Sequence, residues 1–165
     1  MLWKKSPSQP IEIVEELSKK IGVNKSIAEL LVARGIYDFE SAKYFFRPEW
    51  SHLHDPFLMK DMKEAVTRIQ KAIDTGEGVM IFGDYDVDGT TSVALLTSYL
   101  NDKIPKLRAY IPDRYNEGYG ISKKGIQEAQ ADGISLIIAL DCGVKAIEQI
   151  NYANSLEIDF IICDH

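Results

Sequence analysis

The chain has 165 residues, of which 45% are hydrophobic and 27% are charged, which is the composition of an ordinary globular domain. This composition excludes a disordered chain, a collagen and a coiled coil, and the length predicts a sizeable core. No apolar run approaches the ~18 residues of a membrane span, and no apolar stretch follows the lysines near the start, so we expect neither a membrane anchor nor a secretory signal. With only Cys142 and Cys163, no disulfide framework is expected, and the predicted compartment is the cytoplasm.

The net charge of -6 is concentrated in the second half of the chain. Residues 1–75 hold 12 basic and 11 acidic side chains, whereas residues 76–165 hold 7 and 14. This distribution argues against a simple basic patch for nucleic acid. Two interpretations stay open: a solvated acidic surface, or a cluster of carboxylates that recruits divalent metal ions and thereby accepts a phosphate.

The first part of the chain has the spacing of short helices. Apolar residues at helical intervals predict three helices before residue 46, and Asn24 and Asp38 are suited to cap the second and the third. An irregular aromatic segment follows, and then a long amphipathic helix over about residues 61–74. We predict a helical N-terminal region with a lead-in loop over residues 1–60 and an α/β domain over residues 61–165.

The second part alternates strand-like and helix-like segments. Four short apolar runs have the pattern of strands buried on both faces: VMIF (79–82), LRAYI (107–111), SLIIAL (135–140) and DFIIC (159–163). Helix-like segments separate them at 91–101, 122–131 and 144–154. This alternation predicts an α/β fold with a parallel sheet, flanking helices and right-handed crossovers. Ligands of such sheets bind at the carboxyl ends of the strands.

Acidic residues follow the predicted strands. GDYDVDGTTS (83–92) comes after the first run, Asp141 after the third, and Asp164 with His165 after the fourth. A single aspartate in this position commonly caps a helix, but several strand ends converge on one sheet edge, where unpaired carboxylates would repel one another. Bound metal ions relieve this repulsion, and oxygen ligands with a histidine suit Mn²⁺ or Mg²⁺.

Two other families share part of the first acidic motif. Its D-x-D-x-D-G opening imitates a calcium-binding EF-hand loop, but the twelfth position is Leu95 instead of a glutamate, and a strand precedes it, so a calcium loop is excluded. The segment 86–90 also resembles the haloacid dehalogenase phosphatases, with Asp86 as the nucleophile. In those enzymes the nucleophile directly follows the strand, whereas here Gly83-Asp84-Tyr85 intervenes. This phosphatase and a non-catalytic metal- or nucleotide-binding module are the alternatives that stay open.

Taken together, the motifs resemble the DHH phosphoesterase superfamily, and most closely its RecJ branch of single-strand-specific exonucleases. The resemblance rests on five segments: HDPFLMKDMKEAVTRI (54–69), GDYDVDGTTS (83–92), IPDRYNEGYGIS (111–122), ALDCG (139–143) and IICDH (161–165). Related pyrophosphatases carry a histidine ligand where this chain has Phe82, which favours the RecJ branch.

The resemblance assigns roles to individual residues. It implies a two-metal site for Mn²⁺ or Mg²⁺ whose ligands are Asp86, Asp88, Asp141 and His165, with Asp141 shared between the ions. Asp84 and Asp164 are implied as supporting or additional catalytic acids. Such a site hydrolyses a phosphodiester with an activated water and needs no protein nucleophile.

Five further residues are candidates for substrate contacts. Gly89 allows a close backbone approach, and a helix that starts near Thr90 directs free N–H groups at an anion. Arg114 suits phosphate oxygens, although a surface salt bridge explains it equally well. Tyr119, like its neighbour Tyr115, either stacks on bases or packs within its loop.

The resemblance also implies the activity of the protein. It implies a 5′ to 3′ exonuclease on single-stranded DNA that releases 5′ mononucleotides in recombination and repair, with single-strand-binding protein and a helicase as further partners and no membrane. The second histidine of the DHH motif, a later aspartate ligand and the distal DNA-binding domains would lie beyond His165. We therefore expect this chain to be an N-terminal portion, inactive or weakly active alone.

Overall fold

The computed structural model describes residues 7–165, which divide into two compact units, one ending at Asp55 and the other beginning at Pro56. Residues 1–6, with the lysines considered for a secretory signal, lie outside the described residues. The domain limits of 1–60 and 61–165 stay a proposal. Across residues 7–165, no helix is both long and apolar enough to cross a membrane.

The first unit is a small helical bundle, as predicted. It comprises α1 (Ile11–Ile21), α2 (Lys25–Val32), α3 (Phe39–Phe46) and the short 3-10 helix η1 (Trp50–His52). The side chain of Asn24 accepts the N–H of Ile27 at 2.9 Å, and that of Asp38 accepts the N–H of Ser41 at 2.8 Å, so both predicted caps are confirmed. The core of this unit is Val14, Leu17, Ala28, Leu31 and Val32.

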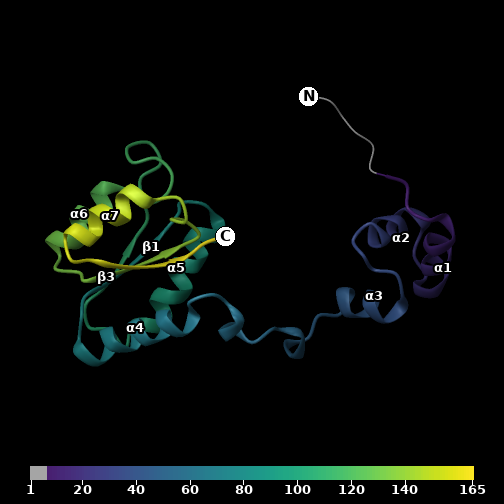
Figure 1. Ribbon diagram of the computed structural model, residues 1–165, viewed down its shortest axis with the longest axis horizontal. Coiled ribbons are helices and arrows are strands. Elements are labelled where there is room, and N and C mark those ends of the chain that lie inside the picture. Colours follow the sequence, from purple (N-terminus) through teal and green to yellow (C-terminus); the bar gives the residue numbers. More distant parts are fainter. Residues whose placement is uncertain (1–6) are drawn as a thin grey trace. The chain divides into compact units, whose positions relative to one another are not determined.

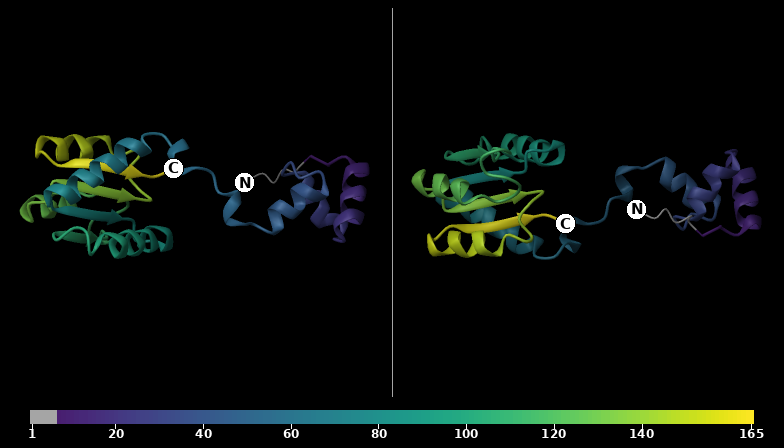
Figure 2. Two further views of the ribbon diagram at one scale, coloured as in Figure 1. Left: turned by 90° about the horizontal axis from the view of Figure 1, so that it is seen from below. Right: turned by 90° about the horizontal axis from the view of Figure 1, so that it is seen from above.

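The second unit is a parallel α/β sheet (Figures 1 and 2). Its strands are β1 (Val79–Gly83), β2 (Leu107–Tyr110), β3 (Leu136–Leu140) and β4 (Asp159–Cys163). Its helices are η2 (Pro56–Leu58), α4 (Met62–Thr75), α5 (Val87–Leu100), α6 (Lys123–Ala131) and α7 (Ile147–Ser155). The strand order is β2-β1-β3-β4 and every pairing is parallel, which confirms the predicted fold class.

Helices cover both faces of the sheet, α6 and α7 on one side and α4 and α5 on the other (Figure 1). Alternate residues of β1 therefore enter different cores. Met80 and Phe82 pack in the core that includes α6 and α7, whereas Val79 and Ile81 pack in the core that includes α4 and α5. Burial on both faces explains why β1 and β3 appear in the sequence as continuous apolar runs.

The strand order creates a switch point between β1 and β3. From β1 the chain crosses by α5 to β2 on one side, and it then returns by α6 to β3 on the other side of β1. Connections leave these two neighbouring strands in opposite directions, and this is the position where open α/β sheets bind their ligands. Asp84 and Asp141 are the residues that directly follow the two strands.

β4 forms one edge of the sheet and pairs only with β3 within the described residues. In contrast to the fully buried β1 and β3, its residues Ile162 and Cys163 are exposed. The prediction of a strand buried on both faces is therefore wrong for β4, and also for the other edge strand β2, in which only Tyr110 is buried.

Two glycines allow the start of α5 to lie directly against the end of β1. A Cβ atom at Gly89 would collide with the Asp84 backbone, 2.6 Å from its nitrogen, and a Cβ at Gly83 would lie 2.9 Å from the Gly89 carbonyl oxygen and closer still to Val93. The helix begins at Val87, earlier than the predicted start near Thr90, because the Asp86 carboxylate caps it by accepting the Gly89 N–H at 2.9 Å.

The predicted start of α7 also needs correction. The helix begins at Ile147 instead of residue 144. The intervening residues form a turn, in which the Ala146 N–H donates to the Gly143 carbonyl at 2.9 Å. Gly143 has a φ of 115°, a conformation that favours glycine and prevents an earlier helix start.

An ion-pair network connects helix α4 to the amino ends of the strands. Arg68 of α4 contacts Glu77 at 2.6 Å and Asp159 of β4 at 2.7 Å. The Glu77 carboxylate also accepts the hydroxyls of Ser135 at 2.7 Å and Thr75 at 3.0 Å. The hydrogen bond from Ser135, followed by that from Arg68, lowers the pKa of Glu77 to about 2.

The lowered pKa of Glu77 predicts a pH-dependent stability. A carboxyl group with a pKa of about 2 in the folded protein and an ordinary value of 4.5 stabilises the fold above pH 4.5, and this contribution is lost as the pH falls towards 2. Because the pair is partly open to solvent, we expect a contribution of about 1–2 kcal/mol. Urea unfolding from pH 6 to pH 2.5 should show a shallower loss for Glu77→Gln than for the wild type, and parallel curves would refute the role of Glu77.

The close contact at Gly89 predicts the effect of a single methyl group. Alanine would gain up to about 1 kcal/mol of helix propensity, but the collision with the Asp84 backbone costs about 1–3 kcal/mol or more, since backbone atoms have no free rotamer to escape to. Gly89→Ala should therefore lower the free energy of unfolding in urea, whereas Thr91→Ala, on the exposed surface of the same helix, should not. Equal stability of the two variants would contradict this account.

Candidate metal centre

Three side chains from the ends of β3 and β4 form the tightest group of metal-binding types within residues 7–165. One potential ligand atom each of Asp141, Asp164 and His165 lies within 4.8 Å of the others. His165 Nδ1 is 4.0 Å from Asp141 Oδ1 and 3.8 Å from Asp164 Oδ1. The structure thus brings Asp164, which was expected as a supporting or additional acid, next to two predicted metal ligands.

The backbone fixes the two aspartates of this group. Asp141 has a left-handed φ of 58°, and its N–H donates to the Cys163 carbonyl at 2.8 Å. Asp164 accepts the N–H of Val144 at 2.9 Å and that of His165 at 2.8 Å. Asp61 and Glu157 adopt the same left-handed conformation, which aspartate tolerates better than most residues, so the φ of Asp141 fixes the course of this turn without by itself identifying a site.

Asp86 and Asp88 lie close enough to act on this group electrostatically. Burial raises the pKa of Asp141, and the charges of Asp86 and Asp88 raise it further, while His165 opposes them. Both aspartates are exposed at the start of α5 and stand outside the three-residue group. Of the four predicted ligands, Asp141 and His165 thus lie in the group, whereas Asp86 and Asp88 act on it only through their charges, and a single cluster of all four stays a prediction.

Asp84 lies beneath the exposed acids and is 1% exposed. Its Oδ1 is buried without a hydrogen-bond partner within the described residues. A buried carboxylate oxygen without a donor is costly, and a cation is one of the few groups that compensates it. Carboxylate oxygens together with one imidazole are also the ligands that Mn²⁺ and Mg²⁺ accept, so the residues present fit such an ion.

One arginine and two tyrosines lie beside the acids. The Arg114 guanidinium lies 5.0 Å from the centre of the Tyr85 ring, and Tyr85 meets Tyr119 edge to face at 6.4 Å. Burial, followed by the charges of Asp84 and Asp164, raises the pKa of the Tyr119 hydroxyl, which places this ring beside the acids. Arg114 forms no salt bridge within residues 7–165, so the cation–π contact replaces the surface salt bridge considered above.

Two of the predicted substrate contacts need a different explanation. The N–H of Gly89 is not free, because it donates to Asp86, and the missing Cβ accommodates the Asp84 backbone. The N–H of Thr90 and its hydroxyl both donate to the Asp86 carbonyl, at 3.0 and 2.6 Å. Gly89 and Thr90 thus shape the turn of the acidic motif in this structure.

The buried thiol next to the group is unreactive. Cys142 is fully buried, and burial, followed by the charge of Asp84, raises the pKa of its thiol to about 12. A thiol with this pKa is not a nucleophile near neutral pH.

The side chain of Tyr115 is 94% exposed, which argues against the interpretation that it packs within its loop.

Sequence reasoning missed Tyr85 and Glu117. Tyr85 stands between two aspartates of the first motif, and this position alone was a signal for a role beside them. An acidic residue in a glycine-containing loop is expected to be exposed, but the side chain of Glu117 is only 4% exposed.

Comparison with known proteins agrees with this geometry. Residues 78–165 match the DHH family, N-terminal domain. The single-stranded-DNA-specific exonuclease RecJ of Bacillus subtilis (strain 168) is 40% identical over 152 residues, which are 92% of this chain and 19% of that protein. RecJ of Escherichia coli (strain K12) is 31% identical over 108 residues, covering 65% of this chain and 19% of that protein. The chain thus spans about a fifth of the length of these relatives.

Solved structures share the fold. A crystal structure of exonuclease RecJ bound to manganese superimposes with a TM-score of 0.60 at 28% identity, over 65% of this chain and 28% of that one. RecJ of Thermus thermophilus in complex with Mn²⁺ gives a TM-score of 0.67 at 22% identity, over 96% of this chain and 22% of that one. The family match covers more than half of the chain and includes all the acids of the candidate metal centre, and the chain therefore belongs to the DHH family.

Proposed function

We propose that this chain contributes metal ligands to a Mn²⁺- or Mg²⁺-dependent phosphodiesterase that degrades single-stranded DNA from its 5′ end. The observation that carries the proposal is the gathering of Asp141, Asp164 and His165 at the carboxyl ends of β3 and β4, with the charges of Asp86 and Asp88 acting on Asp141. The relatives named as single-stranded-DNA-specific exonucleases support the substrate.

The proposed ligands are Asp86, Asp88, Asp141 and His165, with Asp164 as an additional one. Divalent ions bound there supply Lewis acidity and lower the pKa of a water molecule that attacks the phosphodiester. The exposed Arg114 is oriented by Tyr85 and offers its N–H groups to a phosphate of the strand. Tyr119 and Tyr115 offer rings on which bases stack without regard to sequence.

The family match disfavours the phosphatase alternative. Asp86 belongs to a segment that matches the DHH family as a whole, and its carboxylate caps α5. A covalent phosphoryl group on Asp86 is therefore not expected. The non-catalytic alternative predicts metal binding without turnover.

Partners and compartment are separate proposals. Single-strand-binding protein and a helicase, as well as a role in recombination and repair, rest on the resemblance to RecJ alone. The cytoplasm is proposed because Cys142 and Cys163 are both free thiols.

Removing one carboxylate charge from the candidate centre tests its metal binding. Asp141→Asn keeps the left-handed backbone that asparagine tolerates but removes a negative charge from the centre, so the affinity for Mn²⁺ should fall at least tenfold. Isothermal titration calorimetry with MnCl₂ measures this. The control Asp74→Asn removes the same charge from the surface of α4 and should bind Mn²⁺ like the wild type. Equal losses in both variants would show that net charge alone attracts the ion.

Catalysis is tested on the product of the complete gene. With Mn²⁺ it should shorten 5′-labelled single-stranded DNA and spare blunt duplex DNA, and Asp86→Asn should reduce the rate at least a hundredfold. Mass spectrometry of the quenched reaction should find no phosphoryl group on the protein. A phosphorylated Asp86 would favour the phosphatase, and Mn²⁺ binding without hydrolysis would favour the non-catalytic module.

A further inference from the structure

The loop between β2 and α6, residues 111–122, carries the groups proposed to contact DNA. Arg114 and Tyr119 both belong to it, and both meet Tyr85 of the acidic motif. Arg114 is exposed and Tyr119 is 70% exposed, so neither is held by burial in a core. Their position therefore depends on the backbone of the loop together with the contacts to Tyr85.

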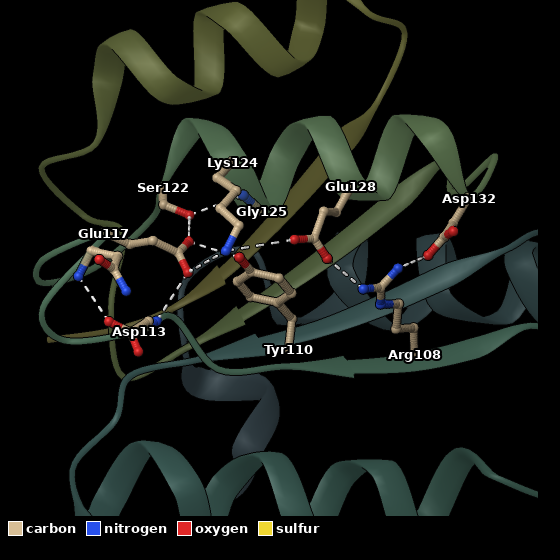
Figure 3. A network of polar contacts seen from close by, with 10 residues as sticks. Arg108, Tyr110, Asp113, Glu117, Ser122, Lys124, Gly125, Glu128 and Asp132 are labelled. Atoms are coloured by element: carbon tan, nitrogen blue, oxygen red, sulfur yellow. Dashed lines mark hydrogen bonds and ion pairs between the residues drawn. The ribbon is translucent and has the colours of Figure 1, made fainter.

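A single carboxylate ties this loop together (Figure 3). Glu117 accepts hydrogen bonds from the Tyr110 hydroxyl at 2.7 Å, from the Ser122 hydroxyl at 2.6 Å and from the Asp113 N–H at 3.0 Å. Tyr110 ends β2, and Ser122 caps α6 by accepting the Gly125 N–H at 3.0 Å. The carboxylate thus connects both ends of the loop to its middle.

The segment around Arg114 depends on the same anchor. The Asp113 side chain accepts the N–H groups of Tyr115 at 2.9 Å and Asn116 at 2.8 Å, and the Glu117 N–H donates to the Asp113 carbonyl at 2.9 Å. Arg114 therefore stands in a tight turn, and the turn is attached to the sheet through Glu117.

The electrostatics support a fixed anion at this position. Burial on its own raises the pKa of Glu117, but the hydrogen bonds from Ser122, the Asp113 N–H and Tyr110 outweigh burial, and the pKa falls to about 2. Lys124 is 3.4 Å away and adds a positive charge. Buried carboxylates with several donors hold their surroundings in one arrangement, and removing the acceptor leaves those donors unpaired.

We propose that Glu117 is a positioning residue, which holds the β2–α6 loop so that Arg114 and Tyr119 face the DNA strand beside the metal centre. This inference rests on the proposed function. Glu117 touches neither the acids of the centre nor, in this arrangement, the DNA, and it acts through the loop. Its loss should therefore weaken substrate binding and leave metal binding intact.

The substitution Glu117→Gln tests this with little change in size. The amide is neutral and keeps only one acceptor oxygen. In one orientation its NH₂ group faces the Asp113 N–H and Lys124, and in the other the hydroxyls of Tyr110 and Ser122 must turn and accept from it, so the charge-assisted hydrogen bonds are lost in both. Glu128→Gln is the matched control. Glu128 is a carboxylate of the neighbouring helix α6 that pairs with Arg108 and shares Lys124 with Glu117, but within residues 7–165 it forms no hydrogen bond or ion pair with the loop itself. Both variants change the net charge equally.

In the product of the complete gene, Glu117→Gln should raise KM for single-stranded DNA about tenfold, with kcat within about threefold and Mn²⁺ affinity within twofold of the wild type. Glu128→Gln should match the wild type in all three. An unchanged KM for Glu117→Gln would overturn the proposal. A loss of Mn²⁺ affinity would overturn it as well, since Glu117 would then support the metal centre.

Trypsin gives a second measurement that needs no activity. The Arg114–Tyr115 bond lies in the anchored turn, and its cleavage rate, followed by mass spectrometry, reports how often the loop opens. We expect Glu117→Gln to raise this rate about tenfold and Glu128→Gln to leave it unchanged. If the wild type lacks Mn²⁺-dependent hydrolysis, the proposed function and the inferred role of the loop in DNA binding both fail. An unchanged trypsin rate overturns the anchoring itself.

Discussion

The contact between the Gly89 backbone and the Asp84 backbone is the constraint on which the acidic centre depends. Only a residue without a Cβ lets the first turn of α5 lie so close to the end of β1. This approach allows Asp86 to cap the helix while the chain still points its acids towards the carboxyl edge of the sheet. A helix displaced by one methyl group would move the charges of Asp86 and Asp88 away from Asp141.

Gathering so many acids at one edge costs folding free energy, because like charges repel in partly buried surroundings. The raised pKa of Asp141 and the partnerless oxygen of Asp84 are two signs of this cost. The protein offsets it elsewhere. Arg68 with Glu77 closes the amino end of the sheet, and the apolar β1 and β3 fill both cores. Stability thus concentrates away from the edge at which chemistry is proposed.

The fold could be predicted because its signals are local. Apolar runs such as residues 159–163 and caps such as Asn24 depend on neighbouring residues only. The start of α5 could not be predicted, since three closely spaced aspartates offer several possible caps and the contact with β1 decides among them. Glu117 was missed for a similar reason. Its burial depends on Tyr110 and Ser122, which become neighbours only when β2 and α6 are in place.

The open edge at β4 has a consequence for the behaviour of this chain in solution. An edge strand presents a row of backbone N–H and C=O groups that another strand can extend. Here the exposed side chains of Ile162 and Cys163 offer no charge that would repel a second copy. Natural edges are commonly protected by lysine, proline or a bulge, and DFIIC contains none of these. Within the part of the chain that the structure describes, the outer backbone groups of β4 are thus available to pair with one further strand.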